Sequence, residues 1–151
     1  MPLHSRQTTE EKDMSNKQNL ANIERAVAAF NDPSGRERYF DLYADDVVLH
    51  GFPAGIPAGI NGVKTFFRGF WEAFPDARLR GEDIVVGEGD RVAIRYAIDG
   101  THRGAFAGVA PTGKKVTVLG QTILRFASGK CAERWNAADM LGLLQQLGAA
   151  P

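Results

Sequence analysis

The sequence lacks most features that would identify a secreted, membrane-bound or nucleic-acid-binding protein. Its 151 residues include one cysteine and no N-terminal apolar stretch typical of a signal peptide, so we expect the reducing cytoplasm. No apolar run approaches the roughly 20 residues that cross a bilayer, so no membrane partner is expected. The 18 Lys and Arg residues balance 18 Asp and Glu, which argues against a nucleic-acid partner. Function is therefore expected to reside in a pocket.

Residues that could hold a metal or a phosphate cofactor are also scarce. The three histidines, His4, His50 and His102, are far apart and lack the paired spacing of a zinc site. Residues 108–115 come close to a phosphate-binding P-loop, but Lys115 stands where the Mg²⁺-binding hydroxyl should be, and a strand-like pattern follows. We therefore expect no metal and no cofactor, and we interpret Cys131 as a structural thiol.

Hydrophobic periodicity divides the chain into a polar N-terminal segment and one folded domain. Residues 1–15 show no apolar periodicity, which predicts a disordered leader, and residues 16–151 form the domain. Helical spacing predicts four helices, and strict alternation predicts five strands. The expected helices follow Ser15, follow Ser34, and cover 61–74 and 140–147; the expected strands cover 46–52, 78–87, 91–99, 115–126 and 131–136.

The order of these elements predicts an α+β fold. The helix at 61–74 carries aromatic residues almost all around its circumference, so it must be buried on more than one side. We expect a curved antiparallel sheet to wrap around the helices as a cone with an internal pocket. The pocket is expected at the end of the cone opposite the closing helix.

Polar residues inside apolar strand patterns are the first candidates for a site, because burying one without a partner costs about 1–3 kcal/mol. They are His50, Arg95, Gln121 and Glu133. Glu133 can pair with Arg95 or face solvent, since alternation does not say which face is inside. His50 and His102 are each more often structural than catalytic, but His102 lies in a glycine-flanked loop, the better place for chemistry.

Asp139, at the junction of the last strand and the closing helix, has two interpretations. An Asp directly before an apolar helix is a preferred N-cap. The same carboxylate could act as a general acid/base at the mouth of an aromatic cavity, whose walls would raise its pKa. Phe70, Trp71 and Trp135 are most simply core residues or cavity walls, where a flat apolar substrate would bind.

Six motifs in a fixed order then resemble the SnoaL-like polyketide cyclases, also called ester cyclases. The resemblance covers roughly residues 18–148, and the combination is far more specific than any one motif. The motifs are A-F-P-D at 73–76, G-D-R-V at 89–92, R-Y-A-I-D-G-T-H-R-G-A-F-A-G at 95–108, P-T-G at 111–113, G-K-x-x-E-x-W-x-x-x-D at 129–139 and Q-Q-L-G at 145–148.

This resemblance implies the NTF2-like α+β cone and a cofactor-free reaction. Cyclases of this type close a ring of an aromatic polyketide ester by intramolecular aldol condensation, with an acidic residue as general acid/base. The Asp that ends E-x-W-x-x-x-D matches Asp139, which is therefore the expected catalytic residue, with His102 or Gln121 polarising the carbonyl. The other residues that the resemblance implies in or around the pocket are His50, Arg95, His102, Gln121, Glu133 and Trp135.

Two other functions remain open at this stage. The first is an NTF2-like hydrolase or dehydratase in which Asp139 activates water, although Arg95 and Asp99 lie four residues apart and so depart from the Arg-x-Asp pattern associated with the epoxide hydrolases of this fold. The second is a non-catalytic module that binds a small apolar molecule. A homodimer is expected in either case, because a single curved sheet leaves one face uncovered and the family usually pairs it.

Overall fold

The structure, a computed structural model, describes residues 7–150. The elements in chain order are α1 (Thr9–Phe30), the 3-10 helix η1 (Arg36–Leu42), β1 (Tyr43–His50), α2 (Ile60–Ala73), β2 (Arg78–Val86), β3 (Arg91–Thr101), β4 (Lys115–Ala127), β5 (Lys130–Ala138) and α3 (Met140–Gln146). Within residues 7–150, no helix is long and apolar enough to cross a membrane.

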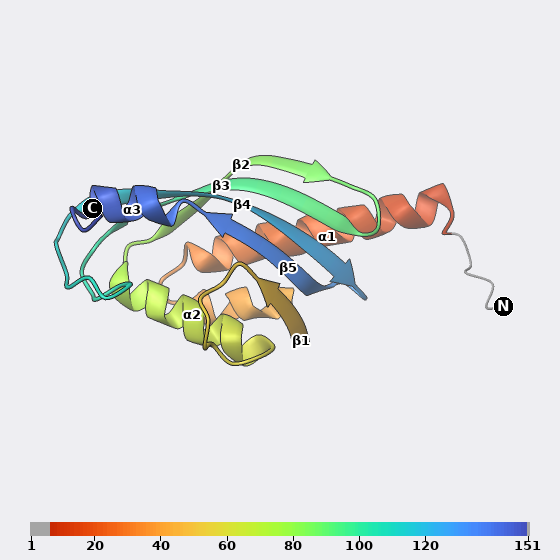
Figure 1. Ribbon diagram of the computed structural model, residues 1–151. Coiled ribbons are helices and arrows are strands. Elements are labelled where there is room, and N and C mark those ends of the chain that lie inside the picture. The colour runs from red at the N-terminus through yellow and green to blue at the C-terminus, as the bar shows by residue number, and fades with distance from the viewer. Residues whose placement is uncertain (1–6, 151) are drawn as a thin grey trace.

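One curved sheet in the order β1-β5-β4-β3-β2 forms the frame of the molecule. Helices α1 and α2 and the turn η1 lie against its concave side, and α3 closes the end of the sheet away from the N-terminus (Figure 1). The expected α+β cone is confirmed. The expectation of a purely antiparallel sheet is wrong in one respect, because β1 pairs with β5 in parallel. That pairing joins segments about 85 residues apart, and a hydrophobic pattern carries no information on it.

Helix α1 begins earlier than the sequence pattern predicted. Thr8 and Glu11 form a reciprocal capping box, in which each side chain accepts a hydrogen bond from the other residue's backbone N–H. The prediction of disorder through Ser15 is therefore wrong from Thr9 onward, while residues 1–6 lie outside the described part of the chain. The first turns of α1 extend past the sheet (Figure 1), so their side chains are exposed and need no apolar stripe.

The remaining boundaries lie close to those expected, with two differences. The segment after Ser34 is a 3-10 helix without a side-chain cap, because Ser34 instead donates its hydroxyl and backbone N–H to the Asp32 carboxylate. The first strand covers Tyr43–His50 rather than 46–52. The aromatic helix, the four later strands and the closing helix lie within two residues of their predicted bounds.

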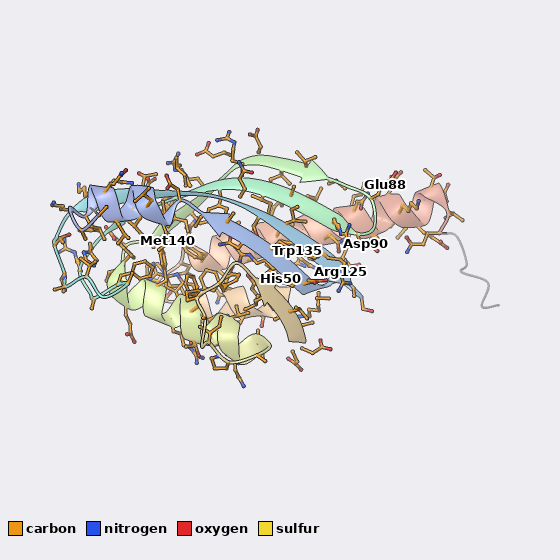
Figure 2. The ribbon with its side chains drawn as sticks, viewed as in Figure 1. His50, Glu88, Asp90, Arg125, Trp135 and Met140 are labelled. Atoms are coloured by element: carbon orange, nitrogen blue, oxygen red, sulfur yellow. The ribbon has the colours of Figure 1, made fainter. Side chains whose placement is uncertain are left out.

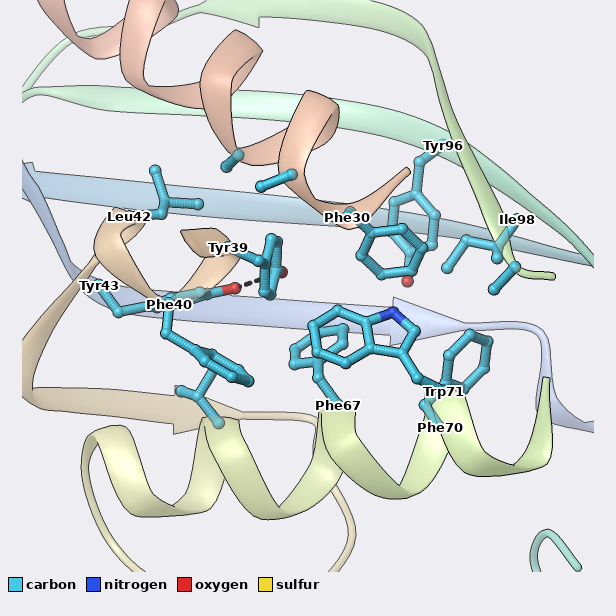
Figure 3. Close-up of a cluster of buried hydrophobic side chains, with 14 of the residues drawn as sticks. Phe30, Tyr39, Phe40, Leu42, Tyr43, Phe67, Phe70, Trp71, Tyr96 and Ile98 are labelled. Carbon is cyan, nitrogen blue, oxygen red and sulfur yellow. Dashed lines mark hydrogen bonds between the residues drawn. The ribbon is translucent and has the colours of Figure 1, made fainter. Parts of the chain in front are cut away.

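Aromatic side chains from three elements make up the centre of the core. Phe30 of α1, Tyr39 of η1 and Trp71 of α2 contact one another edge to face, with ring centroids 5.4–5.9 Å apart (Figure 3). Such pairs contribute about 0.5–1.5 kcal/mol each beyond the area they bury. The aromatic circumference of α2 thus fixes the helix between η1, α1 and the sheet, as its sequence predicted.

Candidate active-site cavity

A bulge in β5 decides which of its side chains face the helices. Phe126 pairs with Cys131 and Arg125 pairs with Glu133, so Ala132 has no partner of its own on β4. The alternation of faces therefore shifts at Ala132. Cys131 and Arg134 both become buried on the concave side, while Glu133 and Trp135 face outward.

The concave side encloses a cavity of about 100 Å³ between the sheet, α1, α2 and α3. Most of its wall is aliphatic or aromatic, and its apolar members include Ile23, Phe66, Phe70, Ile98, Phe106 and Leu143. Because α3 contributes to this wall, the prediction of a pocket at the opposite end of the cone is wrong. The closing helix covers the cavity rather than facing away from it.

One wall of the cavity is polar, and Arg134 lies at its centre. Its Nη1 donates to the hydroxyls of Tyr39 (3.0 Å) and Tyr43 (2.6 Å), and its Nε donates to the Thr122 hydroxyl (2.9 Å). Its Nη2 donates to Oδ1 of Asn136 at 3.2 Å. Arg134 is only 8% exposed, so these partners replace most of its contact with water.

Further contacts hold this polar cluster, which consists of Arg134, Tyr39, Tyr43, Tyr96, Thr122 and Asn136. Tyr96 donates its hydroxyl to Asn136 Oδ1 at 2.9 Å, and the Tyr39 and Tyr43 hydroxyls are 2.7 Å apart. Burial raises the pKa of Tyr43 well above its ordinary value, although Arg134 opposes the effect. Burial also raises the pKa of Tyr96. Both phenols therefore stay protonated at neutral pH, beside a charged guanidinium.

Of the two aromatic residues of α2 predicted to bind substrate, the structure places one at the cavity. Phe70 lines the cavity wall. Trp71 lies behind it in the core, only 8% exposed, and its indole Nε1 has no hydrogen-bond partner among the described residues. The sequence pattern could not separate the two, because both belong to the same buried face of α2.

Five other predicted pocket residues lie on the convex face of the sheet instead: His50, Arg95, Gln121, Glu133 and Trp135. His50 contacts Glu133 at 2.7 Å, and its ring stacks on Trp135 with centroids 5.3 Å apart (Figure 2). Gln121 and Arg95 are cross-strand neighbours on the same face. These five residues do not line the cavity, so a role for them in substrate binding would need the outer surface.

The ion pair considered between Glu133 and Arg95 is absent from the described part of the chain. Glu133 instead contacts His50 and, at 3.2 Å, Arg125. The hydrogen bond from His50 has the largest effect on the pKa of Glu133 and lowers it. Desolvation opposes this effect, but with the hydrogen bond from Arg125 the net pKa is lowered. Arg95 pairs with Asp83 at 2.7 Å, on the neighbouring strand β2.

His102 is completely buried and holds the loop between β3 and β4. The Thr112 backbone N–H donates to Nδ1 at 3.1 Å, so Nδ1 accepts and the ring proton of the neutral form resides on Nε2. Nε2 has no partner among the described residues, and the ring packs on Phe74 at 5.4 Å. His102 does not line the cavity, although Phe106 of the same loop does.

Asp139 does not line the cavity, although it lies at the start of the helix that covers it. Its carboxylate accepts the Gly142 backbone N–H at 2.8 Å, which confirms the predicted N-cap of α3. The side chain is exposed and borders a shallow surface hollow shared with Arg95 and Gln121. Its two neighbours in the chain, Ala138 and Met140, both line the cavity.

The sequence pattern did not indicate the polar cluster. Arg134 and Asn136 alternate in β5 with Glu133 and Trp135. Because both sets contain polar or aromatic residues, the alternation did not show which set faces the core. A signal was present in β4, where the apolar residues Val116, Val118, Leu124 and Phe126 alternate as one buried face. Thr122 belongs to the same buried face of β4. A buried hydroxyl needs a hydrogen-bond partner, so β5, which pairs with β4, can be expected to carry polar residues on that face. Cys131 was interpreted correctly as structural, since burial raises its thiol pKa to about 11.

Comparisons with known proteins agree with this architecture. The sequence model of the SnoaL-like polyketide cyclase family matches residues 21–147. No match was found among curated proteins. Among solved structures, AclR from Streptomyces galilaeus, a candidate hydroxylase, is 32% identical with a TM-score of 0.77, covering 89% of this chain and 98% of its own.

Two further solved structures are similar over nearly the whole domain. IdmH from Streptomyces antibioticus, a candidate polyketide cyclase, is 32% identical with a TM-score of 0.72, covering 87% of this chain and 99% of its own. TsrD from Streptomyces laurentii is 28% identical with a TM-score of 0.74, covering 90% of this chain and 96% of its own. The matched span, the cone and its internal cavity together place the chain in the SnoaL-like polyketide cyclase family, with the NTF2-like fold.

Proposed function

We propose that the protein is a cofactor-independent cyclase that closes a ring of a polyketide-type ester by intramolecular aldol condensation. The observation that carries this proposal is a partly enclosed apolar cavity with one hydrogen-bonding wall. Such a cavity suits a flat substrate with a few oxygens at one end. Family membership supports a cyclase, and the candidate cyclase IdmH supports the same chemistry by similarity.

The reaction needs proton transfers but no oxidant or external group. A base removes a proton from a carbon between two carbonyl groups, and the resulting enolate carbon attacks a third carbonyl carbon, that of a ketone, in the same molecule. The alkoxide formed then takes a proton back. Hydrogen-bond donors placed at the developing negative oxygen lower the barrier to both steps.

Asp139 is the proposed general acid/base. Its position supports this role, because the residues before and after it both line the cavity. The carboxylate is now bound to the Gly142 N–H, so a rotation of its side chain would have to bring it to the substrate. We assign His102 a positioning role, through Thr112, on the loop that carries Phe106 to the cavity.

The present cavity is smaller than a polycyclic substrate. Pockets for drug-sized ligands enclose about 300–1,000 Å³, against about 100 Å³ here. We therefore expect the cavity to widen when substrate enters. Phe106 and Met140, which line the wall from a loop and from the first turn of α3, are the side chains best placed to move.

Ring closure of a model compound tests this proposal. The compound, a diketone ester, is a benzene ring with a β-keto methyl ester side chain (–CO–CH2–CO2CH3) and, ortho to it, a –CH2–CO–CH3 side chain whose ketone is the acceptor. It would be incubated with the protein, and the cyclic aldol product measured by chromatography against buffer alone. Ring closure without incorporation of ¹⁸O from labelled water is expected. No acceleration by protein that binds the compound would reject the cyclase, and ¹⁸O in the product would indicate the hydrolase instead.

A non-catalytic binding module is the second candidate. The exposure of Asp139 and its engagement as a helix cap favour it, because no carboxylate of a described residue then faces the cavity. Tight binding of the diketone ester without ring closure or exchange of its acidic proton for deuterium is the outcome expected of such a module.

We also propose a homodimer formed through the convex face of the sheet. Leu119 and Ile123 of β4 are 53% and 42% exposed on this face, and Val85 of β2, on the far side of β3, is 60% exposed on the same face. Large exposed apolar side chains that share one face of a sheet are typical of an interface. A cytoplasmic location, expected from the single cysteine, stays a prediction.

A further inference from the structure

The polar cluster holds more hydrogen-bond donors than acceptors. A guanidinium has five N–H groups, and four of those on Arg134 reach Thr122, Tyr39, Tyr43 and Asn136. One N–H on Nη2 remains without a partner among residues 7–150. The cluster therefore keeps an unused donor on a cation that is 92% buried, beside an apolar cavity that it helps to line.

The Asn136 amide adds two more donors at the same place. Arg134 can only donate, so the atom of Asn136 that it contacts at 3.2 Å must be the amide oxygen. Tyr96 donates to that oxygen as well, at 2.9 Å. The amide nitrogen of Asn136 then has no acceptor among the described residues. It belongs to the same amide group as the oxygen that Arg134 Nη2 contacts.

The two tyrosines leave a further proton unassigned. The Tyr39 and Tyr43 hydroxyls lie 2.7 Å apart, and both accept from Arg134. One hydroxyl donates to the other, and the proton of the second has no acceptor among the described residues. The surplus of donors is thus shared by Arg134, Asn136 and one phenol, whereas both lone-pair directions of the Asn136 oxygen are occupied.

The positive charge of Arg134 also lacks a counter-ion in the part of the chain described. No carboxylate lies within 4 Å of its guanidinium, and neither Asp nor Glu lines the cavity. The rings of Phe52 and Phe67, at 5.3 and 5.7 Å, supply only a weaker cation–π attraction. Burying an isolated cation costs several kcal/mol, and an apolar side chain at this position would avoid that cost.

We propose that the cavity takes a ligand with an apolar body and a planar oxyanion at its buried end, bound by Arg134 and Asn136. A carboxylate and the enolate of a 1,3-dicarbonyl group share this chemistry, since both spread one negative charge over two coplanar oxygens. The inference rests on the proposed function for the enolate as reacting species. The inference goes beyond the proposed function because it names the charge of the ligand and the residues that select this charge.

Small aromatic acids test the carboxylate arm by binding alone. Benzoate and the uncharged benzamide match in shape, and one ring suits the size of the cavity. By calorimetry at pH 7, benzoate should bind at least about tenfold more tightly than benzamide, as expected for a hydrogen bond to a charged group. Arg134→Gln should reduce the ratio to near one without loss of benzamide binding. Arg78→Gln, which removes an exposed charge from β2, should leave the ratio unchanged.

Two further measurements on the wild-type protein keep the proposal testable if Arg134→Gln does not fold. Benzoate should shift the ¹⁵N resonances of the Arg134 guanidinium, and benzamide should shift them much less. For the enolate arm, 2,4-pentanedione should bind with a lowered apparent pKa, seen as enolate absorbance at a pH where the free compound is largely protonated.

Equal affinity for benzoate and benzamide, together with no lowering of the apparent pKa of 2,4-pentanedione, would overturn the inference, as would a preference for benzoate that survives Arg134→Gln. A response to 2,4-pentanedione without one to benzoate would restrict the ligand to enolates, and the reverse would restrict it to carboxylates. Preference for benzoate without ring closure of the diketone ester would reject the proposed function while supporting this inference.

Discussion

The Asp139 carboxylate accepts the Gly142 backbone N–H at 2.8 Å and so closes the first turn of α3. The same carboxylate is the proposed general acid/base. A stabilising role and a chemical role can be separated here, because Asn caps a helix about as well as Asp does, whereas an amide cannot exchange a proton near neutral pH.

Replacement of Asp139 by Asn and by Ala should therefore have the same effect on turnover but different effects on stability. Asp139→Asn should keep the free energy of unfolding within a few tenths of a kcal/mol, and it should lower kcat for ring closure by roughly 10²–10⁴. Asp139→Ala should in addition lose about 0.5–2 kcal/mol of stability. Denaturant unfolding and single-turnover kinetics measure the two effects. Near-normal turnover by Asp139→Asn would reject the catalytic assignment and leave the cap alone.

Gly120 and Tyr96 are direct cross-strand partners, and the tyrosine ring lies over the glycine. A Cβ at position 120 would collide with the ring and hydroxyl of Tyr96, which donates to Asn136 in the polar cluster. Gly120→Ala should therefore destabilise the fold by about 1–3 kcal/mol, the usual cost of overpacking. It should also weaken benzoate binding, because Tyr96 can no longer hold Asn136.

Gly69 provides the matched control for this substitution. It lies in α2, where an added Cβ would meet no atom within 4 Å. Gly69→Ala should stabilise the protein by about 0.5–1 kcal/mol through helix propensity. Thermal unfolding of both variants measures the difference. Destabilisation by Gly69→Ala as large as that by Gly120→Ala would show that the ring of Tyr96 is not the cause.

Much of the fold could be predicted from local pattern. The aromatic helix was expected at 61–74 and lies at Ile60–Ala73, because its periodicity and its Phe-Pro-Asp stop are both local signals. The parallel pairing of β1 with β5 could not be predicted, since it depends on how the whole sheet closes. The early start of α1 was signalled by Thr8 and Glu11, but the exposed turns that follow carry no apolar period.

The site was harder to predict than the fold, for a specific reason. Strand alternation assigns side chains to two faces, but the extra residue at Ala132 shifts the faces within β5. Strict alternation places Glu133 and Trp135 on the same face as Cys131, whereas in the structure Arg134 shares the buried face with Cys131. Residues before the bulge can be assigned to a face of the sheet from the sequence pattern, but residues after the bulge cannot.

A charge on the convex face should prevent the proposed homodimer. Leu119→Asp places a carboxylate among the exposed apolar residues of β4, where a dimer would bury it without a partner. Sedimentation at tens of micromolar protein should show a dimer for the wild type and a monomer for the variant. Met14→Asp is the control, since Met14 is 72% exposed on α1, which covers the other face of the sheet. A monomeric wild type would contradict the prediction.

Asp76 should make the stability of the protein depend on acid. Partial desolvation raises the pKa of its carboxyl, but hydrogen bonds from the Thr101 hydroxyl and backbone N–H, both 2.7 Å, outweigh it, and the net pKa is lowered. A carboxyl whose pKa is lower in the folded state stabilises the fold at pH values above its pKa in the unfolded state, about 3.9. This contribution is lost as the pH falls through its pKa in the folded state. Asp76→Asn should therefore be less stable than the wild type by about 1 kcal/mol at pH 7, the typical worth of such hydrogen bonds.

The difference in stability between the wild type and Asp76→Asn should shrink below about pH 4. The carboxyl of Asp76 is then protonated first in the unfolded wild type and, at lower pH, in the folded wild type, so its charge no longer favours the fold. Denaturant unfolding at a series of pH values between 3 and 7 measures it. Asp99→Asn makes a useful comparison, since the hydrogen bond from Thr117, assisted by Arg80, lowers the pKa of Asp99 in the same direction. A difference for Asp76→Asn that is the same at pH 3 as at pH 7 would mean that the charge of Asp76 does not contribute, and that its bonds to Thr101 act only through shape.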